Sequence, residues 1–327
     1  MFNAVLLEKD DTGQSASLTT LDQSALPDAD VLVRVDYSTI NYKDALALTG
    51  AAPIARHYPM VPGIDFAGTV EHSEDPRWPV GTRVLLNGWG VGEGHWGGLS
   101  QYARVNGDWL LQVPPSLSTR QVMAIGTAGY TAALCVNALI DHGTAVDDGP
   151  ILVTGATGGV GSISVALLAA AGYQVTAATG KLEAEDYLTN LGAHAVIDRS
   201  TLTESGKPLQ KELWNGVIDA VGGNTLANAC AQTRYSGAVA ACGLAESPKL
   251  PTTVMPFILR GVTLYGIDSV MAPVARRERA WLRIAEHLNI DLLDGMVQEI
   301  ALAQALTEAS SVIAGKVTGR LLVDVNR

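Results

Sequence analysis

The chain has 327 residues, of which 47% are hydrophobic and 17% charged, and its 22 basic and 33 acidic residues give a net charge of −11. This composition is typical of a soluble globular protein, and the length favours two domains over a single core. The acidic balance argues against a nucleic-acid partner, and the longest apolar runs, such as Ser164–Gly172, are too short for a membrane span of roughly 20 residues.

Short strand-like runs separated by turn residues fill the chain from Met1 to about Gln121. They are residues 3–8, 30–38, 66–72, 82–88 and 102–105. This spacing predicts a compact, mainly β first domain. The segment Gly88–Gly98 carries too many glycines for regular structure, so we expect it to be a loop.

After Val122, apolar strand-like runs alternate with stretches of helical length. The strand-like runs are residues 150–155, 173–180, 194–199, 215–222, 237–243 and 262–267. This order predicts an α/β domain with a doubly wound parallel sheet. A last strand-like run, residues 319–326, is able to rejoin the first domain. We therefore expect a discontinuous first domain, residues 1–121 and 268–327, and a second domain, residues 122–267.

A glycine-rich turn joins the first of these later strands to an alanine-rich helix. The sequence ILVTGATGGVG, residues 151–161, keeps Gly158 and Gly161 of the G-x-G-x-x-G pattern but has Ala156 at its first position, with Gly155 and Gly159 as further glycines. This strand, turn and helix context indicates a dinucleotide-binding loop, although a purely structural turn can give the same pattern. The backbone amides expected to face the pyrophosphate are those of Val160, Gly161, Ser162 and Ile163.

The end of the second strand bears on which dinucleotide is bound. NAD-specific sites carry an acidic residue there, about 20 residues past the glycines, whereas this chain has Thr179, Gly180 and Lys181. A hydroxyl, a bare amide and an ammonium can hold a 2′-phosphate, and Arg199 adds a second positive charge. We therefore expect NADP(H). In the alternative, Lys181 and Arg199 are merely solvated and Glu183 binds the ribose.

One carboxylate, Asp65, lies in the apolar stretch MVPGIDFAG, residues 60–68. A buried carboxylate is costly unless it is paired, hydrogen-bonded or bound to a metal. From the residues alone, Asp65 is a metal ligand, a catalytic group or a hydrogen-bonded structural acid.

The cysteines and the first residues of the chain bear on the cellular compartment of the protein. Cys135, Cys230 and Cys242 are widely spaced among small apolar neighbours, which favours reduced core thiols over a metal site. Residues 1–11 lack the basic start and long apolar core of a signal peptide. We therefore expect a cytoplasmic protein.

Seven strings spread over nearly the whole chain carry a resemblance to a known family. They are INYKDALALTG, PMVPGIDFAGTV, GWGVGEGHWGGL, GTAGYTAALC, VTGATGGVGS, AACGLA and LPTTVMPFILRGVTLYGIDSVM. The chain resembles the zinc-free medium-chain dehydrogenase/reductases of the quinone oxidoreductase branch, and most closely the NADPH-dependent acrylyl-CoA reductases. The resemblance implies a GroES-like β-barrel domain and a Rossmann domain with the nicotinamide in the cleft between them. It also implies a homodimer joined near the sheet edge at Thr263–Asp268.

The resemblance also bears on metals and on the reaction. Zinc-dependent relatives have Gly-His-Glu where this chain has Gly63, Ile64 and Asp65, and the zinc-binding cysteine expected near residues 41–44 is missing. We therefore expect no zinc, and Asp65 as a structural acid. Without a Lewis acid to stabilise an alkoxide, reduction of an activated C=C bond remains: NADPH gives hydride to the β-carbon, an enolate forms, and the α-carbon takes a proton.

The polar tetrad Asn41–Asp44, NYKD, is where the resemblance places the catalytic groups. We expect Asn41 to donate to substrate or cofactor, Tyr42 to contact the nicotinamide or donate a proton, and Asp44 to orient either of them. On the residues alone, a surface turn with a helix N-cap explains the tetrad equally well. The resemblance also carries cofactor contacts onto Leu244, Ile258, Ser269 and Asn326.

Three functions remain open at this stage. An acrylyl-CoA reductase needs cationic anchors for coenzyme A phosphates, and Lys43, Arg56 and Arg276 are candidates. A reductase of quinones or other unsaturated carbonyl compounds does not need such anchors, and a non-catalytic NADPH sensor keeps only the cofactor fold. In the glycine-rich loop, Trp89, His95 and Trp96 are candidates for the substrate wall, although such side chains more often are solvated or pack under loops.

Overall fold

The computed structural model describes residues 1–11 and 13–327, and these form two compact units. The first unit comprises Met1–Thr127, Ser269–Met271 and Leu293–Arg327, and the second comprises Ala128–Asp268 and Ala272–Leu292. Residues 272–292 thus group with the second unit, whereas the sequence analysis assigned them to the first domain. They contain helix α8 (Val274–His287), whose Arg279 forms an ion pair of 2.5 Å with Asp141 of the second unit.

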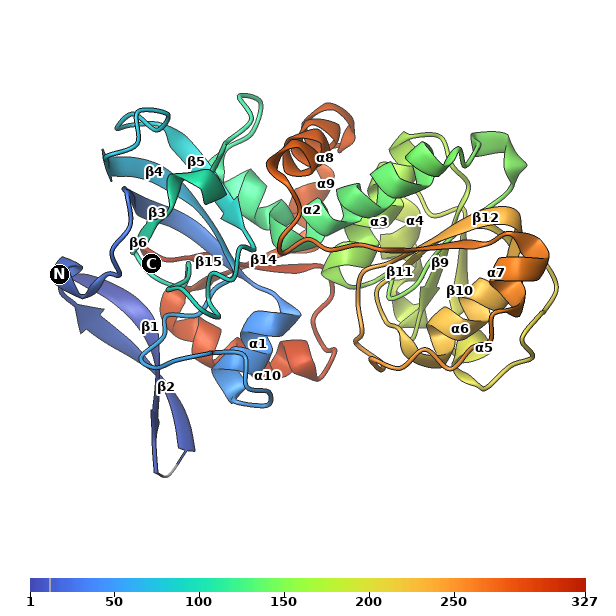
Figure 1. The fold of residues 1–327 in the computed structure, drawn as a ribbon, viewed down its shortest axis with the longest axis horizontal. Coiled ribbons are helices and arrows are strands. Elements are labelled where there is room, and N and C mark those ends of the chain that lie inside the picture. Colours follow the sequence, from blue (N-terminus) through green and yellow to red (C-terminus); the bar gives the residue numbers. More distant parts are fainter. Residues whose placement is uncertain (12) are drawn as a thin grey trace. The chain divides into compact units, whose positions relative to one another are not determined.

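A seven-stranded sheet organises the first unit (Figure 1). Its main order is β14-β15-β3-β4-β5-β7, and β6 also pairs with β3. Strand β15 runs antiparallel to β3, with Leu321 opposite Ile40, which confirms the expected return of the last strand to the first sheet. The strands are β3 (Val31–Ile40), β4 (Asp65–Ser73), β5 (Arg83–Asn87), β6 (Tyr102–Val105), β7 (Leu111–Gln112), β14 (Val297–Ala301) and β15 (Arg320–Asp324).

Smaller elements complete the first unit. Strands β1 (Phe2–Asp10) and β2 (Gly13–Leu21) form a separate antiparallel pair. Helices α1 (Tyr42–Thr49) and α10 (Ala305–Ile313) pack together. The core between the sheet and these helices is mainly aliphatic, with Phe66 and Met60 among its members, and apolar residues of β3 and β4 contribute to it.

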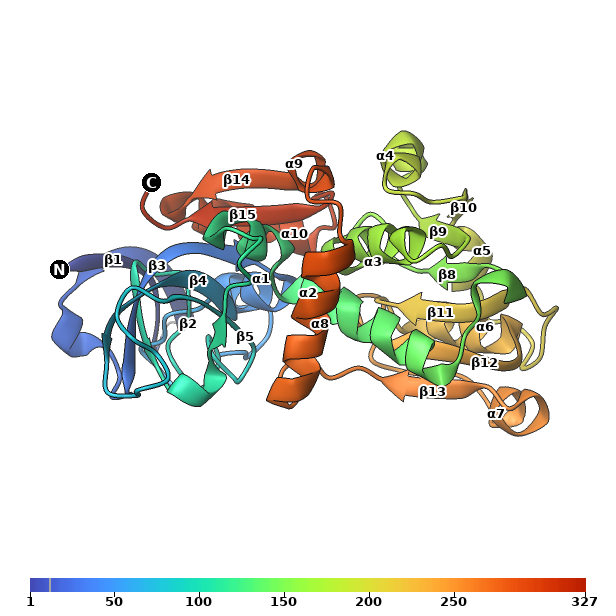
Figure 2. The ribbon, with the colours of Figure 1, turned by 90° about the horizontal axis from the view of Figure 1, so that it is seen from above.

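The second unit contains a six-stranded sheet in which every pairing is parallel. Its order, β10-β9-β8-β11-β12-β13, confirms the doubly wound arrangement predicted from the sequence. The strands therefore end at a common edge, as their arrowheads show in Figure 2. They are β8 (Ile151–Val153), β9 (Val175–Thr179), β10 (Ala195–Asp198), β11 (Trp214–Asp219), β12 (Thr233–Ala241) and β13 (Thr263–Gly266). The helices are α3 (Gly159–Ala170), α4 (Glu185–Asn190), α5 (Ser200–Thr203), α6 (Gly223–Gln232) and α7 (Met255–Arg260), while α9 (Leu292–Met296) lies between α8 and β14 in the chain.

Helix α2 (Thr119–His142) is long and apolar enough to cross a membrane by length and composition alone. The sequence analysis did not detect it. Of its most apolar window, 83% is buried inside the protein, and Gly126, at φ 54° and ψ −162°, breaks its helical path. Both observations are those of a core helix rather than a membrane span.

The break in α2 requires glycine at position 126. A side chain there would need a positive φ, and its Cβ would lie 2.6 Å from Nη2 of Arg320 and 3.0 Å from Oδ2 of Asp65. The next residue, Thr127, donates its backbone N–H to Asp65 Oδ2 at 2.6 Å. The break is therefore fixed by the same carboxylate that the sequence singled out.

Candidate active site and cofactor-binding residues

Asp65 is the centre of a buried polar network in the first unit, made of Thr39, Asn41, Asp44, Asp65 and Arg320. Thr39 Oγ1 donates to Asp65 Oδ1 at 2.6 Å, and Asn41 Nδ2 donates to Asp65 Oδ2 at 3.2 Å. With the N–H of Thr127 on Oδ2 as well, both carboxylate oxygens accept hydrogen bonds from the protein. This confirms Asp65 as a hydrogen-bonded structural acid.

The first turn of α1 brings Asn41 and Asp44 into the same network. Asn41 lies at the N-cap, and its backbone N–H donates to Asp44 Oδ2 at 2.8 Å. Its Nδ2 contacts Asp44 Oδ2 at 3.2 Å and Thr39 Oγ1 at 2.9 Å. Asp44 Oδ1 accepts from the N–H of Ile64, the residue that replaces the zinc ligand, at 2.9 Å. The tetrad thus begins with a helix N-cap, as the structural alternative predicted, and this cap is joined to a buried network, while the catalytic roles remain predictions.

Arg320, at the start of β15, supplies the positive charge of the network. Its Nη1 donates to Asn41 Oδ1 at 3.1 Å, and its Nε donates to the carbonyl oxygen of Ala124 at 3.2 Å. The side chain is almost fully buried, and its Nη2 makes no hydrogen bond within residues 1–11 and 13–327. The sequence analysis missed Arg320, although a lone charge at the start of an apolar strand is the same kind of signal as Asp65.

Tyr42 differs from its neighbours in the tetrad because it faces solvent. Its side chain is 41% exposed, and its hydroxyl makes no hydrogen bond in the described part of the chain. Lys43 is held by an ion pair of 2.8 Å with Glu93, which also contacts Arg56 at 3.7 Å. Among the tetrad side chains, Tyr42 therefore has the hydroxyl that is free to meet a ligand, while Asn41 and Asp44 are already satisfied.

Burial controls the electrostatics of the network. Burial, reinforced by the nearby charge of Asp65, raises the pKa of Asp44 to about 7 against the donors from Asn41 and Ile64. Burial lowers the pKa of Arg320, while Asp65 and Asp44 act in the opposite direction. Asp44 is thus an acid that gains or loses its proton near neutral pH.

The glycine-rich loop is held by its own aromatic side chains. His95 Nε2 lies 2.7 Å from the carbonyl oxygen of Arg104, its ring meets Trp109 edge-on, and burial lowers its pKa. Trp96 donates to the carbonyl oxygen of Pro59, and the backbone N–H of Trp89 donates to Val270. These contacts give His95 and Trp96 roles in fixing the loop.

The phosphate loop in the second unit has the geometry of a dinucleotide-binding turn. Helix α3 begins at Gly159 with Gly158 as its N-cap, and a Cβ on Gly161 would lie 2.3 Å from the carbonyl oxygen of Gly155. The helix therefore approaches the turn as closely as only glycine allows. The N–H of Ser162 already donates to Gly158, so the amides left to face an anion are those of Gly159, Val160 and Gly161. Ala156 is buried, and its N–H is bound to Ala178 of β9.

The residues expected to hold a 2′-phosphate come together at the ends of β9 and β10. The N–H of Arg199 donates to the carbonyl oxygen of Thr179, and a Cβ on Gly180 would lie 2.6 Å from Arg199 Nε. The missing side chain at Gly180 is what lets the guanidinium lie there. The N–H of Lys181 donates to Thr179 Oγ1 at 3.0 Å, and burial lowers the pKa of its ammonium while Glu183 opposes this. Thr179, Lys181 and Arg199 thus lie beside one another at this end of the sheet, where Thr179 Oγ1 also lies 3.2 Å from Thr157 Oγ1, and the two basic residues are of the type that binds a phosphate monoester.

Asp219 supports the phosphate loop and was missed by the sequence analysis. It is buried at the end of β11, where its Oδ1 accepts from Thr154 Oγ1 at 2.7 Å and its Oδ2 accepts from the N–H of Gly222 at 2.8 Å. Burial raises the pKa of Asp219 to about 6, against these donors. The acid ties the end of β11 to the start of the loop.

Of the remaining cofactor candidates, the structure brings Leu244 to the phosphate loop's edge of the sheet but not Ile258. Leu244 follows β12 and is 59% exposed, close to Gly222. Ile258 lies on α7, before β13 begins (Figure 2), and Arg260 at the end of α7 donates to the carbonyl oxygen of Ala231 in α6. Leu244 and Ile258 both remain predicted cofactor contacts.

Ser269 and Asn326 belong to the first unit. Asn326 follows β15, and its Nδ2 donates to the carbonyl oxygen of Val35 at 3.1 Å. Ser269 precedes Val270, which lies against Gly88 of the glycine-rich loop. Both remain predicted cofactor contacts.

The cysteines are free thiols in the second unit. Cys135 and Cys230 are fully buried, whereas Cys242, after β12, is partly exposed and donates its S–H to the carbonyl oxygen of Asp219 at 3.3 Å. The pKa of Cys135 is raised by its hydrogen bond with Cys242 and by burial, and burial raises the pKa of Cys230 to about 12. Cys135 and Cys230 therefore favour the neutral thiol, while the S–H of Cys242 is engaged with a carbonyl oxygen.

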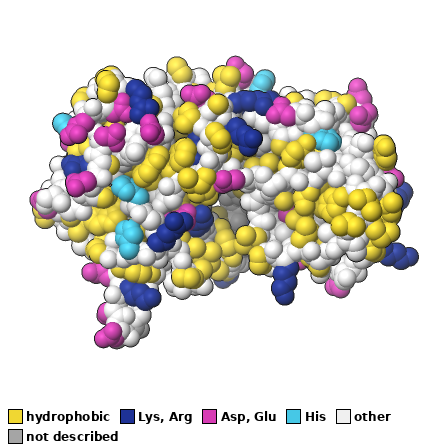
Figure 3. Space-filling model, viewed as in Figure 1, with side chains coloured by type: hydrophobic (Ala, Val, Ile, Leu, Met, Phe, Trp, Pro, Cys, Tyr) yellow, Lys and Arg dark blue, Asp and Glu magenta, His cyan; other side chains and the backbone are white. Residues whose placement is uncertain are grey.

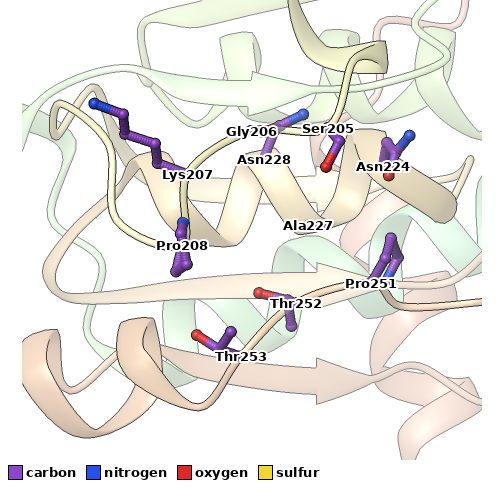
Figure 4. Close-up of a pocket in the computed structure, with 10 residues that line it drawn as sticks. All are labelled: Ser205, Gly206, Lys207, Pro208, Asn224, Ala227, Asn228, Pro251, Thr252 and Thr253. Carbon is purple, nitrogen blue, oxygen red and sulfur yellow. The ribbon is translucent and has the colours of Figure 1, made fainter.

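A cavity of about 160 Å³ lies elsewhere in the second unit, between residues 205–208, α6 and residues 251–253 (Figure 4). Its polar walls are already engaged, because Asn228 donates to the carbonyl oxygens of Leu202 and Glu204, and Asn224 donates to that of Thr203. These contacts hold the loop against α6, and we assign the cavity no ligand.

The matches to known families cover both units. The model for the alcohol dehydrogenase GroES-like domain matches residues 27–115, and that for zinc-binding dehydrogenases matches residues 159–285. The chain is 51% identical to the acrylyl-CoA reductase AcuI of Ruegeria pomeroyi, with 100% of both chains covered. This chain belongs to the medium-chain dehydrogenase/reductases, in the branch of the acrylyl-CoA reductases. The GroES-like and Rossmann domains expected from the resemblance are thereby confirmed.

Solved structures of this branch carry two different dinucleotides. YhdH of Escherichia coli K-12 with bound NADPH is 54% identical to this medium-chain reductase, covers 99% of this chain and 100% of its own, and has a TM-score of 0.97. YhfP of Bacillus subtilis with bound NAD is 43% identical, covers 99% of both chains and has a TM-score of 0.95. The fold alone therefore does not distinguish the two cofactors.

One of the matching families is named for zinc binding. Within residues 1–11 and 13–327, no group of three or more His, Cys, Asp and Glu side chains could hold a metal ion. Ile64 occupies the position of the histidine ligand, and the oxygens of Asp65 are taken by protein donors. The donor set of this medium-chain reductase does not fit a zinc ion.

We expect the free energy of unfolding to fall as the pH rises from about 4 to about 7. In this range the folded protein holds a proton on Asp44, whose pKa is about 7, while the unfolded chain, in which this carboxyl has its ordinary pKa of 3.8, has released it. Urea unfolding of the wild type and of Asp44→Asn at four pH values measures the difference, roughly 1 to 4 kcal/mol across the range.

The slope of this difference with pH, rather than its absolute size, tests the assignment to Asp44. Asp36→Asn, which removes a partly exposed acid from β3, is the matched control and keeps the wild-type slope. An unchanged slope in Asp44→Asn contradicts the prediction.

Proposed function

We propose that this chain is an NADPH-dependent reductase of the activated C=C bond of acrylyl-CoA, with propionyl-CoA as the product. The observation that carries this proposal is the full-length identity of 51% to a protein named as an acrylyl-CoA reductase. The phosphate loop and the cation pair at Gly180 support the cofactor, and the exposed Tyr42 beside a buried network supports catalysis.

The residues of the second unit fit a bound NADPH. The amides of Gly159, Val160 and Gly161 hold the pyrophosphate, and Lys181, Arg199 and the hydroxyl of Thr179 hold the 2′-phosphate. NADPH, when bound, supplies hydride to the β-carbon of the substrate. Leu244 offers an apolar surface beside the edge where the strands end.

The first unit supplies the polar groups for the rest of the reaction. Hydride addition places negative charge on the thioester oxygen, and a hydrogen-bond donor there stabilises the enolate. Tyr42 has a free hydroxyl for that donation, while Asn41 and Asp44 hold the turn that carries it. Of the candidate coenzyme A anchors, Lys43 pairs with Glu93 at 2.8 Å, Arg56 approaches the same carboxylate at 3.7 Å with a side chain that is 71% exposed, and Arg276 is exposed.

Two further properties belong to this proposal. We place the enzyme in the cytoplasm, where free thiols such as those of Cys135, Cys230 and Cys242 persist.

We also propose a homodimer. Within the described chain, β13 has a strand on one side only, and the neighbouring Val254, Ile258 and Leu259 are exposed and apolar. Figure 3 shows the broad hydrophobic area on this part of the second unit.

We expect the wild type to oxidise NADPH with acrylyl-CoA and to show a kcat/KM at least about 100-fold above that for a free enone or quinone, since coenzyme A contacts contribute binding energy to the transition state. Tyr42→Phe should retain NADPH binding and lose about 100-fold in kcat, because the enolate loses a donor. Stopped-flow and steady-state absorbance of NADPH measure both. Tyr235→Phe, which alters an exposed tyrosine of the second unit, is the control.

A higher kcat/KM for quinones would identify a quinone reductase instead. NADPH binding without oxidation, across enoyl-CoA, enone and quinone substrates, would identify a non-catalytic sensor.

We expect Lys181→Ala and Arg199→Ala each to raise the Kd for NADPH about 10- to 100-fold, because each removes a charged hydrogen bond to the 2′-phosphate. The Kd for NADH, which lacks this phosphate, should change less than about twofold. Cofactor fluorescence titration measures both values, with Lys211→Ala as an exposed-lysine control. An equal increase in Kd for NADPH and NADH would show that these cations do not bind the 2′-phosphate.

We expect Ile258→Asp to convert a dimer into a monomer in sedimentation velocity, since the change puts a charge into an apolar interface. Val80→Asp alters a residue that is 68% exposed in the first unit and should leave the dimer intact. A wild type that sediments as a monomer, or a dimeric Ile258→Asp variant, contradicts this interface.

A further inference from the structure

Two charges on different strands converge on one amide in the first unit. Arg320 Nη1 of β15 donates to Asn41 Oδ1 at 3.1 Å, and Asp65 Oδ2 of β4 accepts from Asn41 Nδ2 at 3.2 Å. We infer that Arg320 and Asp65 are positioning residues of the reaction, which fix the amide of Asn41 in one orientation and thereby hold the turn that presents Tyr42. This inference rests on the proposed reductase function.

The two charges determine which end of the amide is the oxygen. A guanidinium only donates hydrogen bonds, and a carboxylate only accepts them. Turning the amide of Asn41 over would bring its NH2 against Arg320 and its oxygen against Asp65, so that donor meets donor and acceptor meets acceptor. The pair therefore selects a single orientation.

In this orientation the donors of Asn41 are used up. Nδ2 has two hydrogens, and it lies within 3.2 Å of oxygens of Thr39, Asp44 and Asp65. Asn41 thus acts as a bridge between α1 and the sheet rather than as a donor to the substrate. The donor role predicted for Asn41 passes to Tyr42, the next residue, whose position depends on that bridge.

The same pair also holds the break in α2. Arg320 Nε donates to the carbonyl oxygen of Ala124, and Asp65 Oδ2 accepts from the N–H of Thr127, on either side of Gly126. Removing one partner leaves a buried charge without its counterpart, so both contacts weaken together. The turn of α1 and the break of α2 are therefore coupled through two side chains.

The test uses four variants: Arg320→Gln, Asp65→Asn and the two double variants that add Asn41→Ala to each. Kinetics and hydrogen exchange are measured on all of them. We expect kcat for acrylyl-CoA to fall at least about tenfold while the Kd for NADPH stays within about twofold, because the cofactor-binding residues of the second unit are untouched. Adding Asn41→Ala should lower kcat only slightly further, because the three residues act as one unit. Arg83→Gln, which removes a guanidinium that donates to the carbonyl oxygen of Leu117, is the matched control and keeps the wild-type kcat.

Hydrogen exchange gives a readout that does not depend on any substrate. The amide of Thr127 should lose protection in Asp65→Asn and Arg320→Gln and keep it in Arg83→Gln. If the wild type fails to reduce acrylyl-CoA, the proposed substrate is wrong, and the kinetic arm then uses the enone or quinone that it does reduce.

Three results would overturn the inference. They are a wild-type kcat in folded Arg320→Gln or Asp65→Asn, additive losses with Asn41→Ala, and unchanged protection of Thr127. If Arg320→Gln does not fold, Arg320→Lys replaces it. Lysine keeps the charge but cannot reach Ala124 and Asn41 from two separate nitrogens, so kcat should stay at least about threefold below the wild type, and a wild-type kcat overturns the inference.

Discussion

A carboxylate removed from water must find donors, and the first unit is arranged around that requirement at Asp65. Its oxygens take hydrogens from a strand residue, Thr39, from the cap of α1, Asn41, and from the backbone after the break in α2, Thr127. The nearby guanidinium of Arg320 offsets part of the charge. One side chain thus sets the relative positions of two helices and two strands.

The second unit must instead leave space for a negatively charged ligand. Glycine residues provide most of this space, because they have no side chain. Gly161 lets α3 approach the turn, and Gly180 leaves space that the guanidinium of Arg199 enters. Asp219 holds the strand ends together by accepting hydrogen bonds from Thr154 and Gly222. The anion-binding groups are backbone amides and two cations, held by buried hydrogen bonds.

Much of this could be predicted from the sequence, because local patterns carry it. Alternating strands and helices predicted a doubly wound parallel sheet, and the glycine spacing predicted the phosphate loop. The break at Gly126 and the convergence of Asp65 and Arg320 on Asn41 could not be predicted in this way, because they join residues more than 60 and 250 positions apart in the chain.

The sequence and the structure lead to different interpretations of Asn41. As a polar residue in a matched motif it suggests a group that touches the substrate. The structure shows that its hydrogen-bonding capacity is spent on Thr39, Asp44, Asp65 and Arg320. A polar residue in a family motif can therefore be fully engaged within the protein.

The state of the cysteines has a consequence for the lifetime of the enzyme. Acrylyl thioesters are electrophiles that alkylate thiolates, so a protein that handles them is exposed to damage by its own substrate. Cys135 and Cys230 are fully buried with raised pKa values, and the S–H of Cys242 is held by a carbonyl oxygen. Burial of Cys135 and Cys230 therefore keeps two of the three thiols away from such an electrophile.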